Sequence, residues 1–448
     1  MVSMKWLVLG VAVLMYALVI AFQDRKLWFT TGAAILVLVL ATVTGGIFAL
    51  PSGVAPGSTG ALLYPILHSF LEIINWNVLM IYLGSMAIAA LFIYSKVPAR
   101  IADAIVGGCG NTGIAMVAIL AMTGIISIFV ENVATVLVMA PIALALCRKI
   151  KCSPVYFMMG LAVMSNLEGT ATLVGDPPSM IFASYAGYNF NDFFVHDGRL
   201  SIFFIIQSGM LAGCLFFYGF FARNGKNRIT AEKTDVISWV PFILLLSMIF
   251  GLAAVSFIPS APSFLSGLFV LALGIIGVLW YKLCQKKSTA ETRELVQGLD
   301  WETIFFLIGI FIVIGAIREA GLLDDFAAFL AGVTGGSKFA GFFIILLVSI
   351  VISGFVDNVP YIIAMLPVAG SMAQAMNLHP ELYMFALLVG SCLGGNLTPF
   401  GASANIVSMG IIKKEGHPIN FGGWIKIGVP FTIITTAVAA IVLWLLWA

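Results

Sequence analysis

Residues 130–141 read VENVATVLVMAP and residues 356–367 read VDNVPYIIAMLP, and each stretch places an acid–asparagine pair inside a long apolar segment. The two acids, Glu131 and Asp357, are 226 positions apart. The same offset relates three further pairs: Pro141 and Pro367, Thr172 and Thr398, and Gly175 and Gly401. Chance would not keep the same separation between so many pairs of distinctive residues. We therefore interpret the chain as two copies of one structural unit.

The composition indicates a protein that lies mostly in lipid. Of the 448 residues, 61% are hydrophobic and 9% are charged, whereas a soluble domain carries roughly 25% charged residues. The longest polar runs, residues 223–235 and 286–300, have the length of loops and leave no room for a soluble enzyme domain. Because the net charge is only +2 and no basic tail exists, we expect no nucleic-acid partner.

Cysteine spacing argues against a metal or disulfide framework. The six cysteines form no CxxC pair, and none has a histidine at metal-ligand spacing, so neither a zinc site nor a disulfide framework is expected. No nucleophile–base pair or metal triad appears either. We therefore expect no cofactor, and an enzyme is the least favoured class.

Apolar segment lengths predict the membrane spans. A helix needs about 20 apolar residues to cross a bilayer. Eight segments meet this length: 6–22, 28–50, 76–95, 200–222, 238–258, 263–283, 302–318 and 426–447. Two more, about 153–187 and about 381–412, are interrupted midway by Gly, Pro and Asp or Asn. Two others, about 111–148 and about 337–376, are too long for one span and carry the acid–asparagine pairs near their midpoints, so we expect re-entrant hairpins.

The predicted fold is an all-α polytopic membrane protein built from two inverted repeats, each with five transmembrane helices, a re-entrant hairpin and a broken helix. The first repeat covers residues 1–222, a cytoplasmic linker covers 223–236, and the second repeat covers 237–448. Five crossings per repeat turn the second copy upside down. Inverted repeats with discontinuous helices near the midplane are typical of secondary transporters, and they place the binding site at the repeat interface.

Basic residues predict the orientation. In this topology Lys5, Arg199, Arg318 and Lys338 fall on one side, and the other 18 of the 22 basic residues fall on the opposite side. The positive-inside rule assigns the side with 18 to the cytoplasm. We therefore expect a multi-pass protein of the inner (plasma) membrane with both termini outside the cytoplasm.

Acids at the four breaks predict a site for a coupling ion. The candidate residues are Glu131, Asp357, Glu168 and Asp176. Holding a charged carboxylate at membrane depth costs several kcal/mol, so acids at both tips favour proton or cation handling. Helix capping is the alternative for Asp357 and for Asp176, which precedes Pro177; glutamate is a poor cap, so Glu131 is expected to do more. A Na+ ion is expected near Glu131, Asn132, Asp357 and Asn358.

Amides and hydroxyls near the same breaks predict the substrate site. The candidate residues are Asn132, Asn358, Thr170, Thr172, Ser179, Asn396, Thr398, Ser403 and Asn405. The alternative role of the two tip asparagines is turn formation. No Arg or Lys lies between Ile101 and Cys147, Ser153 and Gly198, or Phe339 and Ile412. A bound anion would therefore need helix N-termini, amides, hydroxyls and a co-bound cation.

The hairpin motifs at 130–141 and 356–367, together with GTATLVGDPPSMI at 169–181 and GGWIKIGVPF at 422–431, resemble the ion transporter superfamily. The likeness covers essentially the whole chain, and the arsenite-efflux and P-protein branch, related to the divalent anion:sodium symporters, is most similar. This resemblance implies a homodimer with a scaffold and a transport domain that moves as an elevator. The dicarboxylate branch carries Ser-Asn-Thr at the tips; Glu131-Asn132-Val133 and Asp357-Asn358-Val359 depart from that pattern and favour proton or cation coupling.

The sequence thus predicts a secondary active transporter that couples H+ or Na+ to a small anion or oxyanion across the inner membrane. One rival is a Na+/H+ antiporter with no anion substrate, which an acid-rich, base-free core permits. A second is an arsenite or antimonite efflux permease, whose neutral substrate needs no positive side chain. A third is a channel, which saturable flux driven by a second gradient would exclude.

Overall fold

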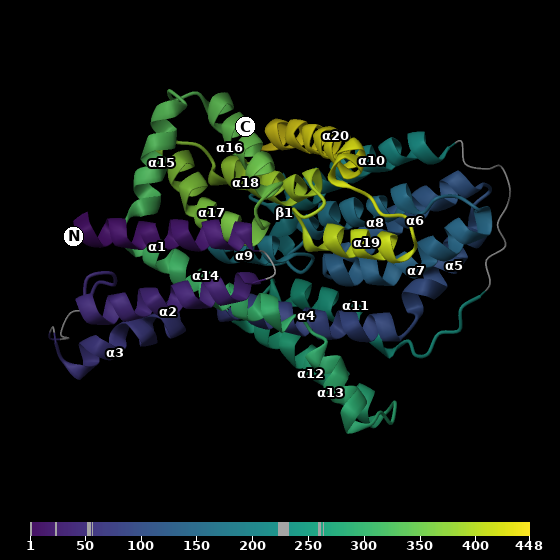
Figure 1. Ribbon diagram of the computed structural model, residues 1–448, viewed down its shortest axis with the longest axis horizontal. Coiled ribbons are helices and arrows are strands. Elements are labelled where there is room, and N and C mark those ends of the chain that lie inside the picture. Colours follow the sequence, from purple (N-terminus) through teal and green to yellow (C-terminus); the bar gives the residue numbers. More distant parts are fainter. Residues whose placement is uncertain are drawn as a thin grey trace.

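The computed structural model describes residues 2–22, 25–51, 55, 57–222, 233–258, 261–262 and 264–448, most of which are helical (Figure 1). The first half contains α1 (Val2–Ala21), α2 (Lys26–Thr44), α3 (Thr59–His68), α4 (Trp76–Tyr94), α5 (Val97–Gly108), α6 (Thr112–Ser127), α7 (Asn132–Ile150), α8 (Val155–Glu168), α9 (Pro177–Ala186) and α10 (Ile202–Phe221). The second half contains α11 (Val240–Val255), α12 (Leu265–Leu283), α13 (Thr289–Gln297), α14 (Trp301–Glu319), α15 (Leu322–Val333), α16 (Lys338–Ser353), α17 (Asn358–Ala375), α18 (Pro380–Gly394), α19 (Ser403–Lys414) and α20 (Phe421–Trp447). The predicted all-α class is confirmed, and the predicted linker 223–236 lies largely outside the described residues.

Short elements complete the chain. They are the π-helix η2 (Ser69–Ile73), the 3-10 helices η3 (Gly169–Ala171), η4 (Asn191–Phe193) and η5 (Gly395–Leu397), and the strands β1 (Val195–His196) and β2 (Arg199–Leu200). The two strands pair antiparallel in a two-residue ribbon between α9 and α10. This ribbon was not predicted from the sequence.

Apolar length identifies the spans in the described part of the chain. The helices long and apolar enough to cross a membrane are α1, α2, α4, α7, α10, α12, α14 and α20. Two predicted spans are shorter than expected. Helix α11 has 16 residues, about 24 Å at 1.5 Å per residue, and α2 ends at Thr44 because Gly45, at φ +61°, closes it in the left-handed region.

Helix boundaries in the two halves follow the 226-residue offset. Helices α6 and α16 end at Ser127 and Ser353, and α7 and α17 begin at Asn132 and Asn358. The acid–asparagine pairs therefore form helix–turn–helix tips, as the sequence predicts. Figure 1 shows α6 and α7 toward one end of the long axis, and α16 and α17 toward the other. That arrangement agrees with hairpins that enter from opposite sides, although the inversion of the repeat stays a prediction.

The two predicted helix breaks follow the same offset. Helix α8 ends in η3 before α9, and α18 ends in η5 before α19. Gly175 and Gly401 are needed because a Cβ at either position would contact backbone: Ser127 O at 2.8 Å for Gly175, and Gly354 O at 2.9 Å for Gly401. Each break therefore packs directly on the hairpin of its own half.

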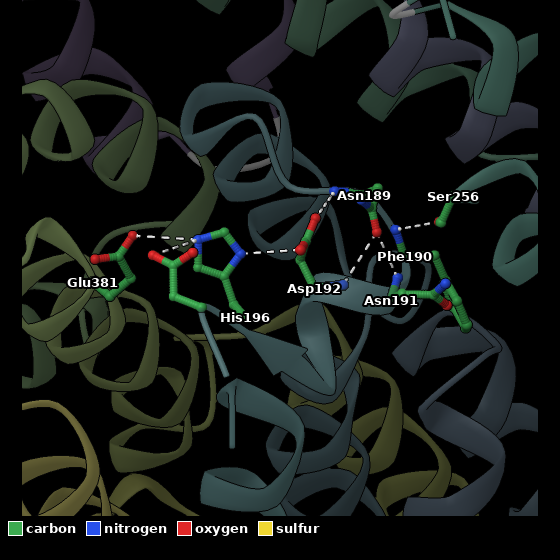
Figure 2. Close-up of polar contacts among 8 residues, drawn as sticks. Asn189, Phe190, Asn191, Asp192, His196, Ser256 and Glu381 are labelled. Atoms are coloured by element: carbon green, nitrogen blue, oxygen red, sulfur yellow. Dashed lines mark hydrogen bonds and ion pairs between the residues drawn. The ribbon is translucent and has the colours of Figure 1, made fainter. Parts of the chain in front are cut away.

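The connection between α9 and α10 is fixed by a polar cluster (Figure 2). His196 Nδ1 lies 3.0 Å from Asp192 Oδ1, and its Nε2 lies 3.8 Å from Glu381 Oε1 at the start of α18. The Phe190 amide donates to Ser256 Oγ at 3.2 Å, next to the end of α11. This connection thereby joins elements of both halves.

Candidate functional site

A cavity of about 460 Å³ lies where the two hairpin tips and the two helix breaks meet. We call residues 129–133 tip 1 and residues 355–359 tip 2. Six of the predicted site residues line this cavity: Glu131, Asn132, Asp176, Asp357, Asn358 and Ser403. Seven are not among its lining residues: Glu168, Thr170, Thr172, Ser179, Asn396, Thr398 and Asn405. The structure thus brings together the tips and the starts of α9 and α19.

Tip 1 is packed into the first helix break. Glu131 Oε2 accepts a hydrogen bond from the Ala134 amide at 2.9 Å and caps α7. Ser127 Oγ donates to Asn132 Oδ1 at 2.7 Å, and Asn132 is only 6% exposed. The expectation that glutamate caps poorly is wrong here, because the longer side chain folds back to the third residue of the helix. Glu131 still lines the cavity with its cap in place.

Tip 2 is held by a residue from the first half of the chain. Asp357 Oδ1 accepts from the Val359 amide at 3.1 Å and caps α17, and Oδ2 accepts from Lys26 Nζ at 3.0 Å. Lys26 also lies over the Phe306 ring, 4.9 Å from its centroid. The two side chains of the ion pair are 19% and 25% exposed. The ion pair is therefore partly shielded from solvent.

Lys26 corrects the prediction of a base-free core. From the sequence, Lys26 is predicted to be one of the basic residues of the cytoplasmic loops, since it precedes an apolar run. As the first residue of α2, it instead points at the tip of a hairpin more than 300 residues away. Among the described residues that line the cavity, Lys26 is the one lysine or arginine.

The lining of the cavity includes two more acids that sequence reasoning missed. Asp300 and Glu302, at the start of α14, line the cavity beside Tyr82 of α4. Tyr82 Oη donates to Asp300 Oδ2 at 3.2 Å, and the Thr303 amide donates to Asp300 Oδ1 at 3.0 Å. A signal was present: Asp300 directly precedes Trp301, which lies 225 positions after Trp76 and so within one residue of the repeat offset. Five carboxylates therefore line the cavity among the residues that the structure describes.

Asp176 occupies the N-cap position of α9, but its side chain makes no capping hydrogen bond. Pro177 and Pro178, the first two residues of the helix, lack N–H groups, and the Ser179 amide donates to the main-chain oxygen of Asp176 at 3.1 Å instead. The alternative capping role of Asp176 is therefore not seen. Its carboxylate faces the cavity instead.

The two repeat-matched threonines have equivalent structural partners. Thr172 Oγ1 donates to Ile128 O, and Thr398 Oγ1 donates to Gly354 O, each at 2.5 Å. Both residues are buried, at 0% and 2% exposure. Each hydroxyl connects a break to its hairpin. Because its hydrogen atom is donated to a main-chain carbonyl, it is not available to donate to a substrate.

An asparagine cluster joins the two breaks. Asn166 Nδ2 donates to Asn396 Oδ1 at 2.8 Å and to Asn405 Oδ1 at 2.9 Å. Asn405 Nδ2 donates to the carbonyls of Gly395 and Thr398, both at 2.9 Å. Asn166 was not predicted, yet it lines the cavity, and its buried Oδ1 has no hydrogen-bond partner among the described residues.

Glu168 lies apart from the cavity. It is fully buried, and Gln207 Nε2 of α10 donates to its Oε2 at 2.5 Å. Its Oε1 is buried with no hydrogen-bond partner in the described part of the chain. Nearby, Ser179 Oγ donates to Thr170 O at 3.2 Å, and Thr170 Oγ1 donates to Asn166 O at 3.3 Å. These hydroxyls serve the backbone of the first break.

The side chains that the structure describes form no preformed metal-binding site. Among the residues that the structure describes, no group of three or more His, Cys, Asp or Glu side chains is arranged to hold a metal ion. The cavity acids are distributed over tip 1, tip 2, α9 and α14. A cation bound there would combine one carboxylate with amide, hydroxyl or carbonyl oxygens.

The chain has helices that are long and apolar enough to span a bilayer, and two further helices that are broken beside a shared polar cavity. Together these features define a multi-pass membrane transporter. The family described as "Citrate transporter" (CitMHS) matches residues 16–390, and the chain belongs to this family. The predicted membership of the ion transporter superfamily is thereby confirmed.

Relatives and a solved structure agree with this assignment. "Uncharacterized transporter Rv2684" of Mycobacterium tuberculosis (strain ATCC 25618 / H37Rv) is 32% identical over 378 residues, covering 83% of this chain and 86% of that protein. The "P protein" of Sus scrofa is 23% identical over 458 residues, covering 84% of this chain and 53% of that protein. The YdaH transporter of Alcanivorax borkumensis superposes with a TM-score of 0.61 at 14% identity, covering 93% of this chain and 97% of that chain, and shares the fold.

Proposed function

We propose that this transporter is secondary active and moves a small anion or oxyanion together with H+ or Na+. The observation that carries the proposal is the charge of the cavity. Five carboxylates (those of Glu131, Asp176, Asp300, Glu302 and Asp357) face one lysine. The family description supports a carboxylate as the anion.

Charge balance explains why coupling would be obligatory. Coulomb repulsion between unit charges is several kcal/mol at about 4 Å in a partly shielded site. An anion entering a cavity with five acids and one base is therefore repelled unless protons or cations enter with it. We assign coupling-ion binding to Glu131, Asp357 and Asp176. Asn132, Asn166, Asn358 and Ser403 would contact the substrate from the same lining.

The movement follows from the resemblance to elevator transporters. The hairpins and broken helices, α6–α9 and α16–α19, would form the moving domain, and the remaining helices would form the scaffold of a homodimer.

The inner membrane is the proposed location, with both termini outside the cytoplasm. Cys284 is exposed and lies on the proposed cytoplasmic side. A membrane-impermeant maleimide should label it in inverted vesicles and not in intact cells.

The test of function uses purified protein in liposomes loaded with a pH-sensitive dye. A sodium jump is imposed first without any added anion, and a panel of citrate, other carboxylates, oxyanions and arsenite follows. We expect no pH change until one anion is added. An anion flux that is independent of both the pH and the sodium gradients would overturn coupling.

Na+/H+ exchange without an anion is a second candidate, and the excess of carboxylates over bases in the cavity favours it. In that case the sodium jump alone changes the internal pH. Two matched variants then test whether Glu131 belongs to the exchange site. Glu131→Gln should abolish the response, whereas Glu291→Gln, on the polar helix α13, should not change it.

A further inference from the structure

Lys26 and Asp357 connect two groups of helices. Helix α2 packs against α14, α1 and α3, and its first residue reaches tip 2. A second link lies beside it, where Tyr16 Oη of α1 donates to Pro360 O of α17 at 3.0 Å. The start of α17 is thus fastened to the α1–α2 pair by one ion pair and one hydrogen bond.

The ion pair uses the oxygen of Asp357 that a ligand would need. Oδ1 is occupied by the α17 cap, so Oδ2 is the oxygen left for a cation, and Lys26 Nζ takes it at 3.0 Å. The same ammonium is the one basic group among the described residues lining the cavity, so an anion would compete with Asp357 for it.

We propose that Lys26 is a built-in cation that holds tip 2 in the empty transporter, and that the pair opens only when a bound cation replaces Lys26 at Asp357 while a bound anion replaces Asp357 at Lys26. This inference rests on the proposed function. Opening the pair without replacement leaves two partly buried charges uncompensated, which is strongly unfavourable. Each ligand supplies the charge that the other has displaced.

Coupling between the two ligands follows from this exchange of partners. An anion that draws Lys26 away leaves Asp357 Oδ2 free, and a cation that binds Asp357 frees the ammonium. Each ligand then raises the affinity for the other by the same factor, because such linkage is reciprocal. The single base in the acidic cavity would in this way connect cation binding to anion binding and to the release of tip 2.

The first test needs no substrate. Hydrogen–deuterium exchange of residues 355–362 is measured in the purified, ligand-free protein and in Lys26→Met, Asp357→Asn and the double variant. Asn keeps the oxygen that caps α17. We expect each single variant to exchange about tenfold faster, as for a local opening that loses one partly buried ion pair. The double variant should add little to either single one, because both remove the same interaction.

Lys5→Met is the matched control. Lys5 forms another lysine–aspartate pair, with Asp325 of α15, and is not among the residues lining the cavity. Its loss should leave exchange at 355–362 unchanged. Exchange at wild-type rates in both Lys26→Met and Asp357→Asn would overturn the proposal.

The second test separates this inference from the proposed function. In liposomes, the coupling cation should raise the anion affinity of Lys26→Met by a smaller factor than in the wild type, because the exchange of partners is lost while repulsion by the remaining cavity acids persists. A Lys26→Met protein with the wild-type cation dependence would contradict the exchange of partners. Wild-type protein that moves no anion would instead contradict the proposed function, and the hydrogen-exchange result would still decide whether Lys26 holds tip 2.

Discussion

Glu131 and Asp357 occupy equivalent positions in the two hairpin tips, but their surroundings differ. At tip 1 the neighbouring Asn132 is 6% exposed and is held by Ser127 from the same hairpin. At tip 2 the equivalent Asn358 is only partly buried, and the acid is held by Lys26 from the other half of the chain. Two positions that match in sequence are therefore fixed by different means, one by local packing and one by a distant charge.

This difference suggests a division of roles. Tip 1 is built into its helix break, so its acid can change charge without releasing the hairpin. Tip 2 depends on an ion pair, so a change of charge there would alter how the hairpin is held.

The largest effect is expected for Glu131→Gln. The amide oxygen of Gln can still cap α7, so folding should persist, while the ionisable group is lost. Coupled flux should be abolished, and no pH dependence should remain in the residual flux. Proteoliposome uptake across a pH series measures this, with melting temperature in detergent as the control for folding. A well-folded variant with the wild-type pH profile would exclude Glu131 as the coupling residue.

Alanine at the two repeat-equivalent glycines of the helix breaks should have unequal effects, because only Gly169 packs against a tip residue. A Cβ at Gly169 would collide with Asn132 Oδ1, which Ser127 holds in place, whereas a Cβ at Gly395 meets Gly401 O at 3.0 Å. We expect Gly169→Ala to cost about 2–3 kcal/mol through overpacking and a lost hydrogen bond. Gly395→Ala should cost less. Thermal unfolding of both variants measures the difference, and equal losses would contradict the tighter packing of tip 1.

Valine at the two threonines should have equal effects. Thr172 and Thr398 donate to equivalent hairpin carbonyls at the same distance of 2.5 Å. Each Thr→Val change should cost about 1 kcal/mol, the typical net value of one hydrogen bond. Melting temperatures of the two variants measure this. A large loss of substrate affinity with unchanged stability would instead restore the role in substrate binding predicted from the sequence.

The smallest effect is expected far from both tips, on α13. Glu291 pairs with Lys287 at 2.8 Å and completes a capping box with Ser288. The hydrogen bond from Lys287 and the Ser288 amide lower the pKa of Glu291 from 4.5 to about 2. A lowered pKa means that the stabilisation is present above pH 4.5 and is lost only as the pH falls through about 2. Glu291→Gln should therefore leave the pH profile of transport unchanged between neutral and mildly acidic pH.

The sequence predicted the hairpins and breaks well, because local chemistry determines them. Acid–asparagine pairs inside apolar runs, and Gly or Pro at a constant offset, mark where a helix must stop inside the membrane. The predicted turns at 131–132 and 357–358 lie between the helices observed there. Boundaries of the intact spans were less predictable, as the early end of α2 at Gly45 shows.

The composition of the site was predicted only in part, because it depends on long-range packing. Lys26 was treated as a loop charge, since nothing near it in sequence indicates that α2 begins beside tip 2. Asp300 and Asn166 were missed for the same reason. Thr172 and Thr398 were predicted to contact substrate because hydroxyls near a break are suitable ligands. A pattern of residue types does not reveal that both hydroxyls already donate hydrogen bonds to buried main-chain carbonyls.

The central claim is that an anion enters this acidic cavity only with a proton or cation. The most direct measurement is equilibrium binding, to purified wild-type protein, of the anion that the flux panel identifies. Titrations are made with and without Na+ between about pH 7.5 and 9, where the charge of most carboxylate ligands is constant. We expect the affinity for the anion to fall as the pH rises in Na+-free buffer, or Na+ to restore it. An affinity that is independent of both pH and Na+ would exclude coupled entry of the anion.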